Sequence, residues 1–347
     1  MKALVITAKN KMELKDISIP AIDNEQVLIH VAYAGICGSD LPRYYEGKVH
    51  HFPQIPGHEF SGTIEKIGSD VKGLNIGDKV SVAPLIPCGK CNECKAGFPS
   101  MCTNYTFIGS SVPGALAEYV AVPAQNCLVL PDNLSLAEAA TVEPLTVAIH
   151  GIERVNIRAG ANVLVLGVGS VGLLTVMALK ARGAGKITVV DIKDSSLKVA
   201  QECGANVVIN SAKVDLVDLN EYFKAHSLFD AVFETAGNPI TQVQAIKYAG
   251  KHAKVVFIGK TTRPTTFQYQ EFEQILRKEL EITGSWLSFS APFPGYEWHA
   301  AIDYLSSGRI NTQRLITGIY KLEDKDKPFA VLNDKNSGAI KVMYKIG

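Results

Sequence analysis

The apolar residues of this 347-residue chain change their spacing near position 135. Before it, short runs rich in β-branched residues are separated by Gly, Pro, Asn and Asp. These runs predict strands at residues 3–7, 13–17, 26–34, 62–67, 79–83 and 116–122. Short strands with long loops between them are typical of a β-rich domain.

After position 135, helical and strand patterns alternate. Ser135 and Glu138 form a capping box, so we expect a helix to start at Leu136. We expect it to run to the Glu143-Pro144 step, with Pro144 opening the next helix. Further strands are predicted at residues 162–166, 187–191, 207–209, 230–234, 254–258 and 281–284. This rhythm predicts an α/β domain with a doubly wound parallel sheet, the Rossmann arrangement.

The end of the chain departs from this rhythm. A helix is expected around residues 298–307, and strands near 315–320 and 339–344. We interpret this tail as a return to the first domain. The predicted organisation is a β-rich domain at residues 1–151, an α/β domain at residues 152–290 and the return at residues 291–347.

A glycine-rich turn follows the first strand of the α/β part. It reads Gly167-Val-Gly169-Ser-Val171-Gly172 and leads into a helical pattern. In this order the first glycine allows a tight turn, the second lets the backbone approach a pyrophosphate, and the third lets helix pack on strand. The next strand ends at Asp191, 19 residues after Gly172, where an acid suits the ribose hydroxyls of NAD and repels the 2′-phosphate of NADP. The pattern predicts an NAD site; an ordinary turn with an acidic loop residue is the alternative.

Three further residues stand where strands end or helices begin, namely Thr146, Thr235 and Ile258. Ligands of such folds bind beside the carboxyl ends of the strands, so we expect these residues to line the cofactor crevice. The two threonines are equally suited to be helix caps.

Four cysteines lie within fifteen residues: Cys88, Cys91, Cys94 and Cys102. Two successive CxxC steps and a fourth thiol fit a closed, tetrahedral structural zinc site. An iron–sulfur cluster is the rival interpretation. The polar, lysine-bearing loop favours zinc.

A second set of candidate ligands is dispersed. Cys37 follows a strand, His58 and Glu59 lie at a turn before another strand, and Glu143 precedes a proline. Cysteine, histidine and carboxylate together suit a zinc site that keeps a position open for water or substrate. Each residue alone has an ordinary structural role as alternative, and spacing does not show that they converge.

Composition excludes several classes. A net charge of +1 argues against a dedicated nucleic-acid or anionic-membrane surface, and no apolar span is long enough for a membrane helix. The start of the chain resembles neither a signal nor a transit peptide. Seven cysteines in such a chain suggest metal ligands and free thiols, and we expect a cytosolic protein.

The ordered motifs GICGSD, GHEFSG, the cysteine loop, EPLTVAIHG and LGVGSVGLL resemble the zinc-dependent medium-chain dehydrogenase/reductase family over essentially the whole chain. The resemblance implies a GroES-like catalytic domain before the NAD-binding Rossmann domain, and one catalytic and one structural zinc. It implies that Cys37, His58, Glu59 and Glu143 form the catalytic zinc set, with the two glutamates exchanging as ligands. Glutamate at position 59 together with Glu143 is similar to the polyol dehydrogenase branch.

Further motifs, among them CGSDLPR and FIGS, resemble dehydrogenases of sugar-alcohol phosphates. The implied reaction oxidises a secondary alcohol of such a substrate to a ketose phosphate with NAD. Ser39 is the candidate proton relay, since its hydroxyl both donates and accepts. Sorbitol dehydrogenases usually carry a histidine where this chain has Pro42, so their proton route is not expected here. Arg43 and Lys260 are candidate phosphate contacts, and Trp286 a candidate wall of the substrate pocket. For Arg43 the alternative is pairing with a nearby acid, and for Trp286 a buried core position.

Two other function classes remain. One is the same chemistry on a free polyol, a diol or threonine, for which the zinc and NAD residues would look alike. The other is a non-catalytic cofactor-binding protein, which predicts lost zinc ligands. By family analogy we expect a homodimer or homotetramer joined through edge strands of the nucleotide domain.

Overall fold

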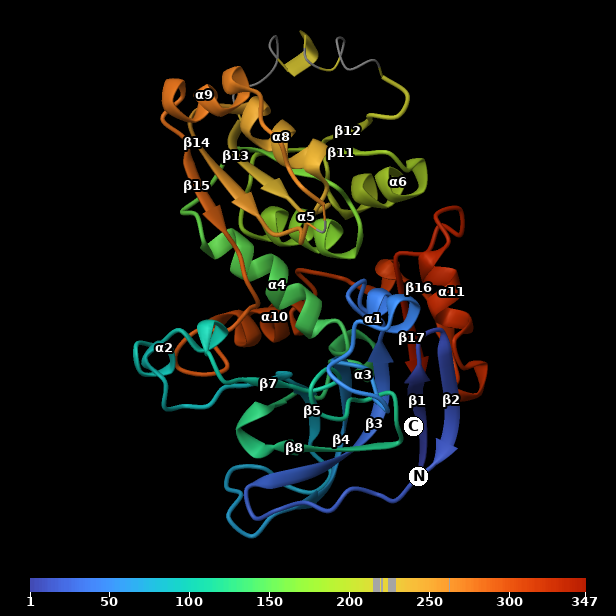
Figure 1. Ribbon diagram of the computed structural model, residues 1–347. Helices are drawn as coiled ribbons and strands as arrows, with labels where there is room; N and C mark the ends of the chain where they lie inside the picture. The colour runs from blue at the N-terminus through green and yellow to red at the C-terminus, as the bar shows by residue number, and fades with distance from the viewer. Residues whose placement is uncertain (215–218, 220, 224–228, 262) are drawn as a thin grey trace. The chain divides into compact units, whose positions relative to one another are not determined.

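The computed structural model describes residues 1–214, 219, 221–223, 229–261 and 263–347 (Figure 1). The chain divides into two compact units. The first comprises residues 1–146 and 289–347, and the second residues 147–288.

A seven-stranded sheet organises the first unit. β3 (Gln26–Gly35) lies at its centre and pairs antiparallel with β4 (Glu59–Ile67), β8 (Tyr119–Pro123) and β17 (Lys341–Lys345). The sheet continues through β16 (Ile316–Tyr320) on one side, and through β5 (Lys79–Val82) and β9 (Cys127–Val129) on the other. The residues after 288 therefore supply two strands, β16 and β17, to the sheet whose central strand is β3.

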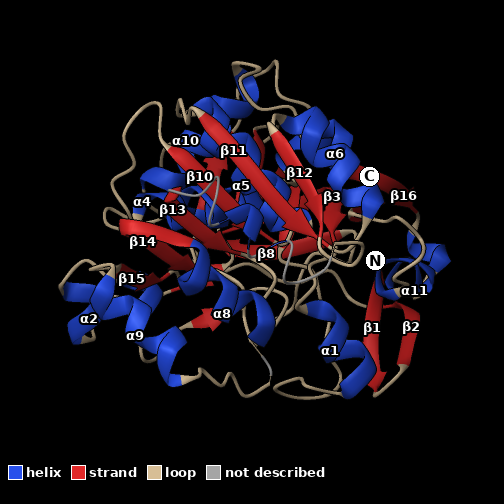
Figure 2. Cartoon of the chain, turned by 90° about the horizontal axis from the view of Figure 1, so that it is seen from above, coloured by secondary structure: helices blue, strands red, loops and turns tan. Residues whose placement is uncertain are grey.

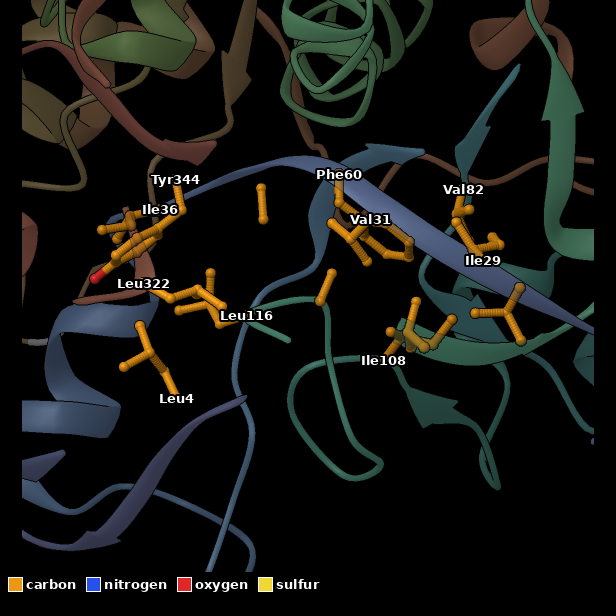
Figure 3. Close-up of a cluster of buried hydrophobic side chains, with 14 of the residues drawn as sticks. Leu4, Ile29, Val31, Ile36, Phe60, Val82, Ile108, Leu116, Leu322 and Tyr344 are labelled. Atoms are coloured by element: carbon orange, nitrogen blue, oxygen red, sulfur yellow. The ribbon is translucent and has the colours of Figure 1, made fainter. Parts of the chain in front are cut away.

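The core of this unit forms between the sheet and the segments around it. Leu4 and Val31 from the first strands, Phe60 from β4 and Tyr344 from β17 are all buried in one apolar cluster (Figure 3). Two small ladders complete the strands: β1 (Lys2–Ala8) with β2 (Lys11–Asp16), and β6 (Leu85–Ile86) with β7 (Thr106–Phe107). Removing such side chains from water is the main force holding the unit together.

Helices of the first unit are short and connect the strands. They are α1 (Asp40–Glu46), α2 (Asn92–Lys95), α3 (Leu136–Ala139), α10 (Tyr296–Ser306) and α11 (Lys327–Asn333), with single 3₁₀ turns at η1 (Pro99–Met101), η2 (Ala124–Asn126), η3 (Gln313–Leu315) and η4 (Leu322–Asp324). Among the helices of the described ranges, none is long and apolar enough to cross a membrane.

The helix prediction around Pro144 was wrong. The Ser135 side chain caps the helix by accepting the backbone N–H of Glu138, and its hydroxyl donates to the Glu138 carboxylate, but α3 ends at Ala139. α4 (Val142–Glu153) then starts before the proline, so that Pro144 is its third residue. The first four N–H groups of a helix have no partner within it, and a proline is therefore tolerated there.

The second unit is built on a six-stranded, wholly parallel sheet of order β12-β11-β10-β13-β14-β15 (Figure 2). Its strands are β10 (Asn162–Leu166), β11 (Lys186–Asp191), β12 (Val207–Asn210), β13 (Phe229–Glu234), β14 (Ala249–Phe257) and β15 (Glu281–Gly284). The described helices between them are α5 (Ser170–Ala181), α6 (Asp194–Cys203), α8 (Pro239–Tyr248) and α9 (Tyr269–Arg277). The predicted doubly wound α/β fold is confirmed.

The strand order indicates where this sheet would bind a ligand. We call the carboxyl ends of its strands the binding edge. From β10 the chain proceeds to β11 and β12 on one side, then crosses to β13, β14 and β15 on the other. The order reverses between β10 and β13, and ligands of such sheets bind in the crevice beside the carboxyl ends at that reversal. The turns after β10, β13 and β14 all lie at this edge.

Candidate active site and metal centres

The cysteine loop brings its four thiols together. The ligand atoms of Cys88, Cys91, Cys94 and Cys102 all lie within 4.8 Å of one another. Backbone N–H groups point at the sulfurs: that of Cys88 lies 3.3 Å from Sγ of Cys102, and that of Cys91 lies 3.4 Å from Sγ of Cys88. The N–H groups of Lys90 and Cys91 lower the pKa of Cys88 to about 6, whereas burial and the neighbouring thiols of Cys91 and Cys102 raise the pKa of Cys94. A compact set of four sulfurs fits a tetrahedral zinc.

A second set of ligand atoms meets at the end of β3. One atom each from Cys37, His58 and Glu59 lies within 4.8 Å of the others. The antiparallel register places Gly35 opposite Glu59, so the residues just after β3 face the first residue of β4. Gly35 also provides space, because a Cβ there would lie 2.5 Å from Oε2 of Glu59. Strand register and one missing side chain thus create the convergence.

Glu143 lies beside this group without belonging to its closest set. It is buried on the first turn of α4. Burial, and then the charges of Glu59 and Cys37, raise the pKa of Glu143 to about 8, while burial and Glu59 raise the pKa of Cys37 to about 11. The pKa values of Glu143 and Cys37 are therefore both raised, and in the absence of a cation both groups favour their protonated forms. A divalent cation would replace those protons, so the donor set fits a zinc ion.

Lys341 is a charged member of the site that the sequence interpretation missed. Its Nζ lies 2.5 Å from Oε2 of Glu59 and donates at 3.2 Å to the carbonyl of Ile36. Burial alone would lower the pKa of Lys341, but the charges of Glu59 and Cys37 raise it, so the ammonium stays charged. The available signal was a lysine at the start of the short apolar run from 341 to 344, all of whose residues are buried.

Asp40 links the candidate metal ligands to Arg43. Its Oδ2 accepts the backbone N–H of Cys37 at 3.1 Å, and its Oδ1 accepts Nη1 of Arg43 at 2.5 Å. The same Oδ1 lies 3.6 Å from Nδ1 of His58. Arg43 also donates to Oγ of Ser110 at 3.1 Å. Asp40 is thus placed to hold the Cys37 loop through a hydrogen bond, and Arg43 is paired with an acid.

Ser39 occupies the exposed side of the same loop. Its backbone N–H lies 3.5 Å from Sγ of Cys37, and its side chain is exposed, next to the buried Asp40. Ser39 is therefore an exposed residue next to a candidate ligand.

The three glycines of the turn in the second unit are needed for different reasons: two by the fold itself, and one for the space that it leaves. Gly167 has φ of 88°, and a Cβ on Gly172 would lie 2.1 Å from the carbonyl oxygen of Gly167, so the fold itself requires both. Gly169 has φ of −69°, and a Cβ there would meet no atom of the described chain within 4 Å. Because the fold does not demand this glycine, the space fits a ligand that approaches the backbone, as a pyrophosphate does at a helix N-terminus.

Asp191 and Thr235 both hold this turn. Oδ2 of Asp191 accepts the N–H of Val168 at 2.7 Å, and its Oδ1 accepts the N–H groups of the two residues that follow Asp191. Oγ1 of Thr235 donates to the carbonyl of Gly167 at 2.6 Å. Val171 is half-buried on the first turn of α5.

The remaining candidates have simpler surroundings. Thr146 is buried and donates to the carbonyl of Glu143 at 2.6 Å, a contact within its own helix. Ile258 packs against Gly151, where a Cβ would lie 2.4 Å from its Cδ1. Lys260 is exposed, and Trp286 is 46% exposed, so Trp286 is not the buried core residue of the alternative interpretation. Arg43 belongs to the first unit, whereas Lys260 and Trp286 belong to the second.

Known proteins resemble both units. The alcohol dehydrogenase GroES-like domain matches residues 23–132, and the zinc-binding dehydrogenase domain matches residues 170–307. Galactitol 1-phosphate 5-dehydrogenase of Escherichia coli (strain K12) is 36% identical over 317 residues, which cover 91% of this chain and 92% of that protein. The chain belongs to the zinc-dependent medium-chain dehydrogenase/reductase family.

Two further comparisons extend this result within the family. The crystal structure of galactitol-1-phosphate dehydrogenase from Escherichia coli matches with a TM-score of 0.93 at 34% identity, over 99% of this chain and 100% of that one. Sorbitol dehydrogenase of Bacillus subtilis (strain 168) is 33% identical over 349 residues, or 99% of this chain and 96% of that protein. The resemblance inferred from the motifs is confirmed, as is the GroES-like plus Rossmann fold. The chain is an oxidoreductase of the zinc-dependent alcohol dehydrogenase type, within its sugar-alcohol dehydrogenase group.

Proposed function

We propose that this dehydrogenase oxidises a secondary alcohol of a sugar-alcohol phosphate to a ketose phosphate with NAD, and that the reaction is galactitol 1-phosphate to tagatose 6-phosphate. The observation that carries the proposal is the meeting of Cys37, His58 and Glu59 in a largely buried site with Glu143 beside them. The choice of a phosphorylated substrate is supported by the likeness to the Escherichia coli enzyme.

Zinc, held by Cys37, His58, Glu59 and Glu143, would supply a Lewis acid for the alcohol oxygen, and NAD would accept the hydride. The protein's own residues would hold and orient these groups. Asp40 keeps the Cys37 loop in place through the backbone N–H. Ser39 would pass the alcohol proton outward, since its hydroxyl both donates and accepts and is exposed. The Cys88 loop would hold a second, structural zinc away from the chemistry.

NAD is proposed over NADP because of Asp191. Its carboxylate ends β11 and is fixed by three backbone N–H groups, so a negative charge is held at the binding edge of the sheet. A 2′-phosphate would be repelled there, whereas ribose hydroxyls would find an acceptor. Gly167 and Gly172 would shape the turn, and Gly169 would let the pyrophosphate approach the backbone.

A second candidate function is the oxidation of a free polyol. Arg43 supports it, because its guanidinium is already bound by Asp40 and Ser110 and is not free for a phosphate. The Bacillus subtilis sorbitol dehydrogenase is nearly as similar as the galactitol enzyme. Phosphate recognition would then fall to Lys260, with Trp286 as a wall of the pocket, or would be absent.

We also propose a homodimer or homotetramer in the cytosol. The edge strand β15 ends the parallel sheet. α9, which precedes β15, exposes Tyr269, Phe272 and Leu276 on one side at the spacing of a helical face. An open edge beside exposed apolar side chains suits a symmetric contact between copies.

Initial rates of cofactor reduction would test the substrate assignment. Galactitol 1-phosphate, galactitol, sorbitol and threonine are compared side by side, each with NAD and with NADP. We expect kcat/KM for the phosphate ester to exceed that for galactitol by about a hundredfold, equivalent to ~2.7 kcal/mol of transition-state stabilisation. Equal or faster oxidation of a free polyol would replace the first proposal with the second.

A further inference from the structure

Glu234 is a fully buried carboxylate at the binding edge of the parallel sheet. It is the last residue of β13. One oxygen, Oε1, accepts the backbone N–H groups of Ala236 and Gly237, both at 2.9 Å, and the hydroxyl of Thr241 at 2.7 Å. A single atom thus fixes the whole turn that leads from β13 into α8.

The same residue also fixes the turn after β14. Its backbone carbonyl accepts the N–H groups of Ile258 at 2.8 Å and Gly259 at 3.0 Å. The two turns are in close contact, because a Cβ on Gly259 would lie 2.1 Å from the backbone nitrogen of Gly237. It would also lie 2.9 Å from Oε2 of Glu234. The carboxylate therefore lies directly against the point where the turns touch.

The turn after β13 contacts the glycine turn as well. A Cβ on Gly167 would lie 2.7 Å from Cβ of Ala236, and Oγ1 of Thr235 would lie 2.7 Å from a Cβ on Gly172. Three turns at the carboxyl ends of β10, β13 and β14 are thus interlocked through residues adjacent to Glu234. These are the turns at which a Rossmann sheet binds its dinucleotide.

The second carboxylate oxygen of Glu234 is in a surrounding that a purely structural anchor would not need. Oε2 is buried and has no hydrogen-bond partner among the residues that the structure describes. Burial raises the pKa of Glu234, against the effect of its hydrogen bonds. An unsatisfied buried oxygen is unfavourable, and such departures from good packing concentrate at functional sites.

We propose that Glu234 is a positioning residue for the dinucleotide, which holds the turns after β13 and β14 in the register that the cofactor requires. The inference rests on the proposed use of a nicotinamide cofactor but not on the substrate. Glu234 does not itself touch the reacting atoms. It acts through Oε1, which sets the turn of Ala236 and Gly237 against that of Gly259.

The test measures NADH binding by fluorescence titration in the zinc-loaded, full-length protein. We expect Glu234→Ala to raise the dissociation constant of NADH about tenfold or more, because the turns that meet the cofactor lose their shared anchor and a misplacement of about 1 Å is costly. Glu234→Gln retains an acceptor for the three donors, so it should return the constant to within about threefold of wild type. Zinc content should not change in either variant.

A second variant perturbs the same contact from the opposite side and leaves the carboxylate intact. Gly259→Ala forces the two turns apart, and we expect it to weaken NADH binding about as much as Glu234→Ala. Gly284→Ala is the matched control, because a Cβ there meets no described atom within 4 Å. If Glu234→Ala does not fold, Glu234→Asp takes its place, because the shorter side chain keeps the charge but withdraws its oxygen from the three donors, and it should weaken NADH binding likewise.

Two results would overturn the inference: NADH affinity within twofold of wild type in Glu234→Ala and Gly259→Ala, or a Gln variant that binds as poorly as the Ala variant. Failure of the proposed substrate is separable. A wild-type protein that binds NADH but oxidises none of the polyols leaves the binding test intact, whereas one that binds neither NADH nor NADPH overturns both proposals.

Discussion

The two cysteine-containing sites of the first unit are constructed in opposite ways. In the Cys88 loop, all four sulfurs come from fifteen consecutive residues, and backbone N–H groups of the same loop point at them. In the Cys37 site, the three converging ligand atoms come from the segment after β3 and from the start of β4, Glu143 lies beside them on the first turn of α4, and Lys341 contributes from β17. In a local site, a bound metal alone can bring the ligands of one loop together. In a dispersed site, the sheet positions the ligands.

This difference separates stability from chemistry. A closed four-thiolate loop has no position for substrate, so a metal bound there would contribute folding free energy. The dispersed site has mixed ligands, and the sheet supports it whether or not a metal is bound. We therefore expect substitutions in the two sites to have different consequences, and Cys127→Ser, which changes a cysteine outside both groups, is the shared control.

The largest effect should come from Cys37→Ser. Loss of the thiolate ligand should lower kcat/KM by about 10³- to 10⁴-fold, or ~4–5 kcal/mol, because the alcohol is no longer polarised. Zinc should fall from two ions per chain to one, while the melting temperature changes little. Steady-state rates and metal analysis check this. Retention of both ions with full activity would show that Cys37 is not a catalytic ligand.

Lys341→Met should have the next largest effect. It leaves Glu59 buried without its partner at 2.5 Å, and removal of one member of a buried pair costs about 3 kcal/mol or more of unfolding free energy. Denaturant unfolding measures this loss in metal-depleted protein. Lys345→Met, an exposed position on the same strand, is the control and should change stability by less than about 0.5 kcal/mol. Equal stability of the two variants would mean that the pair contributes nothing.

Cys94→Ser tests the local site. We expect one zinc to be lost and the unfolding free energy to fall by about 2–3 kcal/mol, since the loop loses its tetrahedral closure. The folded fraction should keep kcat/KM within about threefold of wild type, because the loop lies outside the candidate catalytic set. A loss of activity as large as that of Cys37→Ser, without a change in stability, would reverse the assignment of the two sites.

The smallest effect is expected for Arg43→Lys. The two-pronged contact with Asp40 and Ser110 cannot be reproduced by an ammonium, so kcat should fall by about tenfold for phosphorylated and free polyols alike. Arg309→Lys, exposed in the same unit, is the control. A loss confined to the phosphate ester would instead make Arg43 a substrate contact and sharpen the first proposal over the second.

Much of the architecture could be predicted from sequence because its signals are local. The glycine turn between a strand and a helix, and the alternation that follows it, need only neighbouring residues, and all six parallel strands are present. Element ends were less well predicted. The strand expected at 62–67 starts at Glu59, because its pairing with Gly35 extends it, and the strand expected at 116–122 starts at Tyr119. The helix expected to end before Pro144 ends at Ala139.

The sequence by itself determined the cysteine loop, since all four candidate ligands lie in one short segment. It also determined which residue types were available for an open site. Only the tertiary structure decided that Cys37, His58 and Glu59 meet, because that depends on the register of β3 against β4 and on the absence of a side chain at Gly35. It also decided the partners of Glu59 and Arg43. The lysine that holds Glu59 is 282 residues away in the chain, and no local pattern specifies a contact of that range.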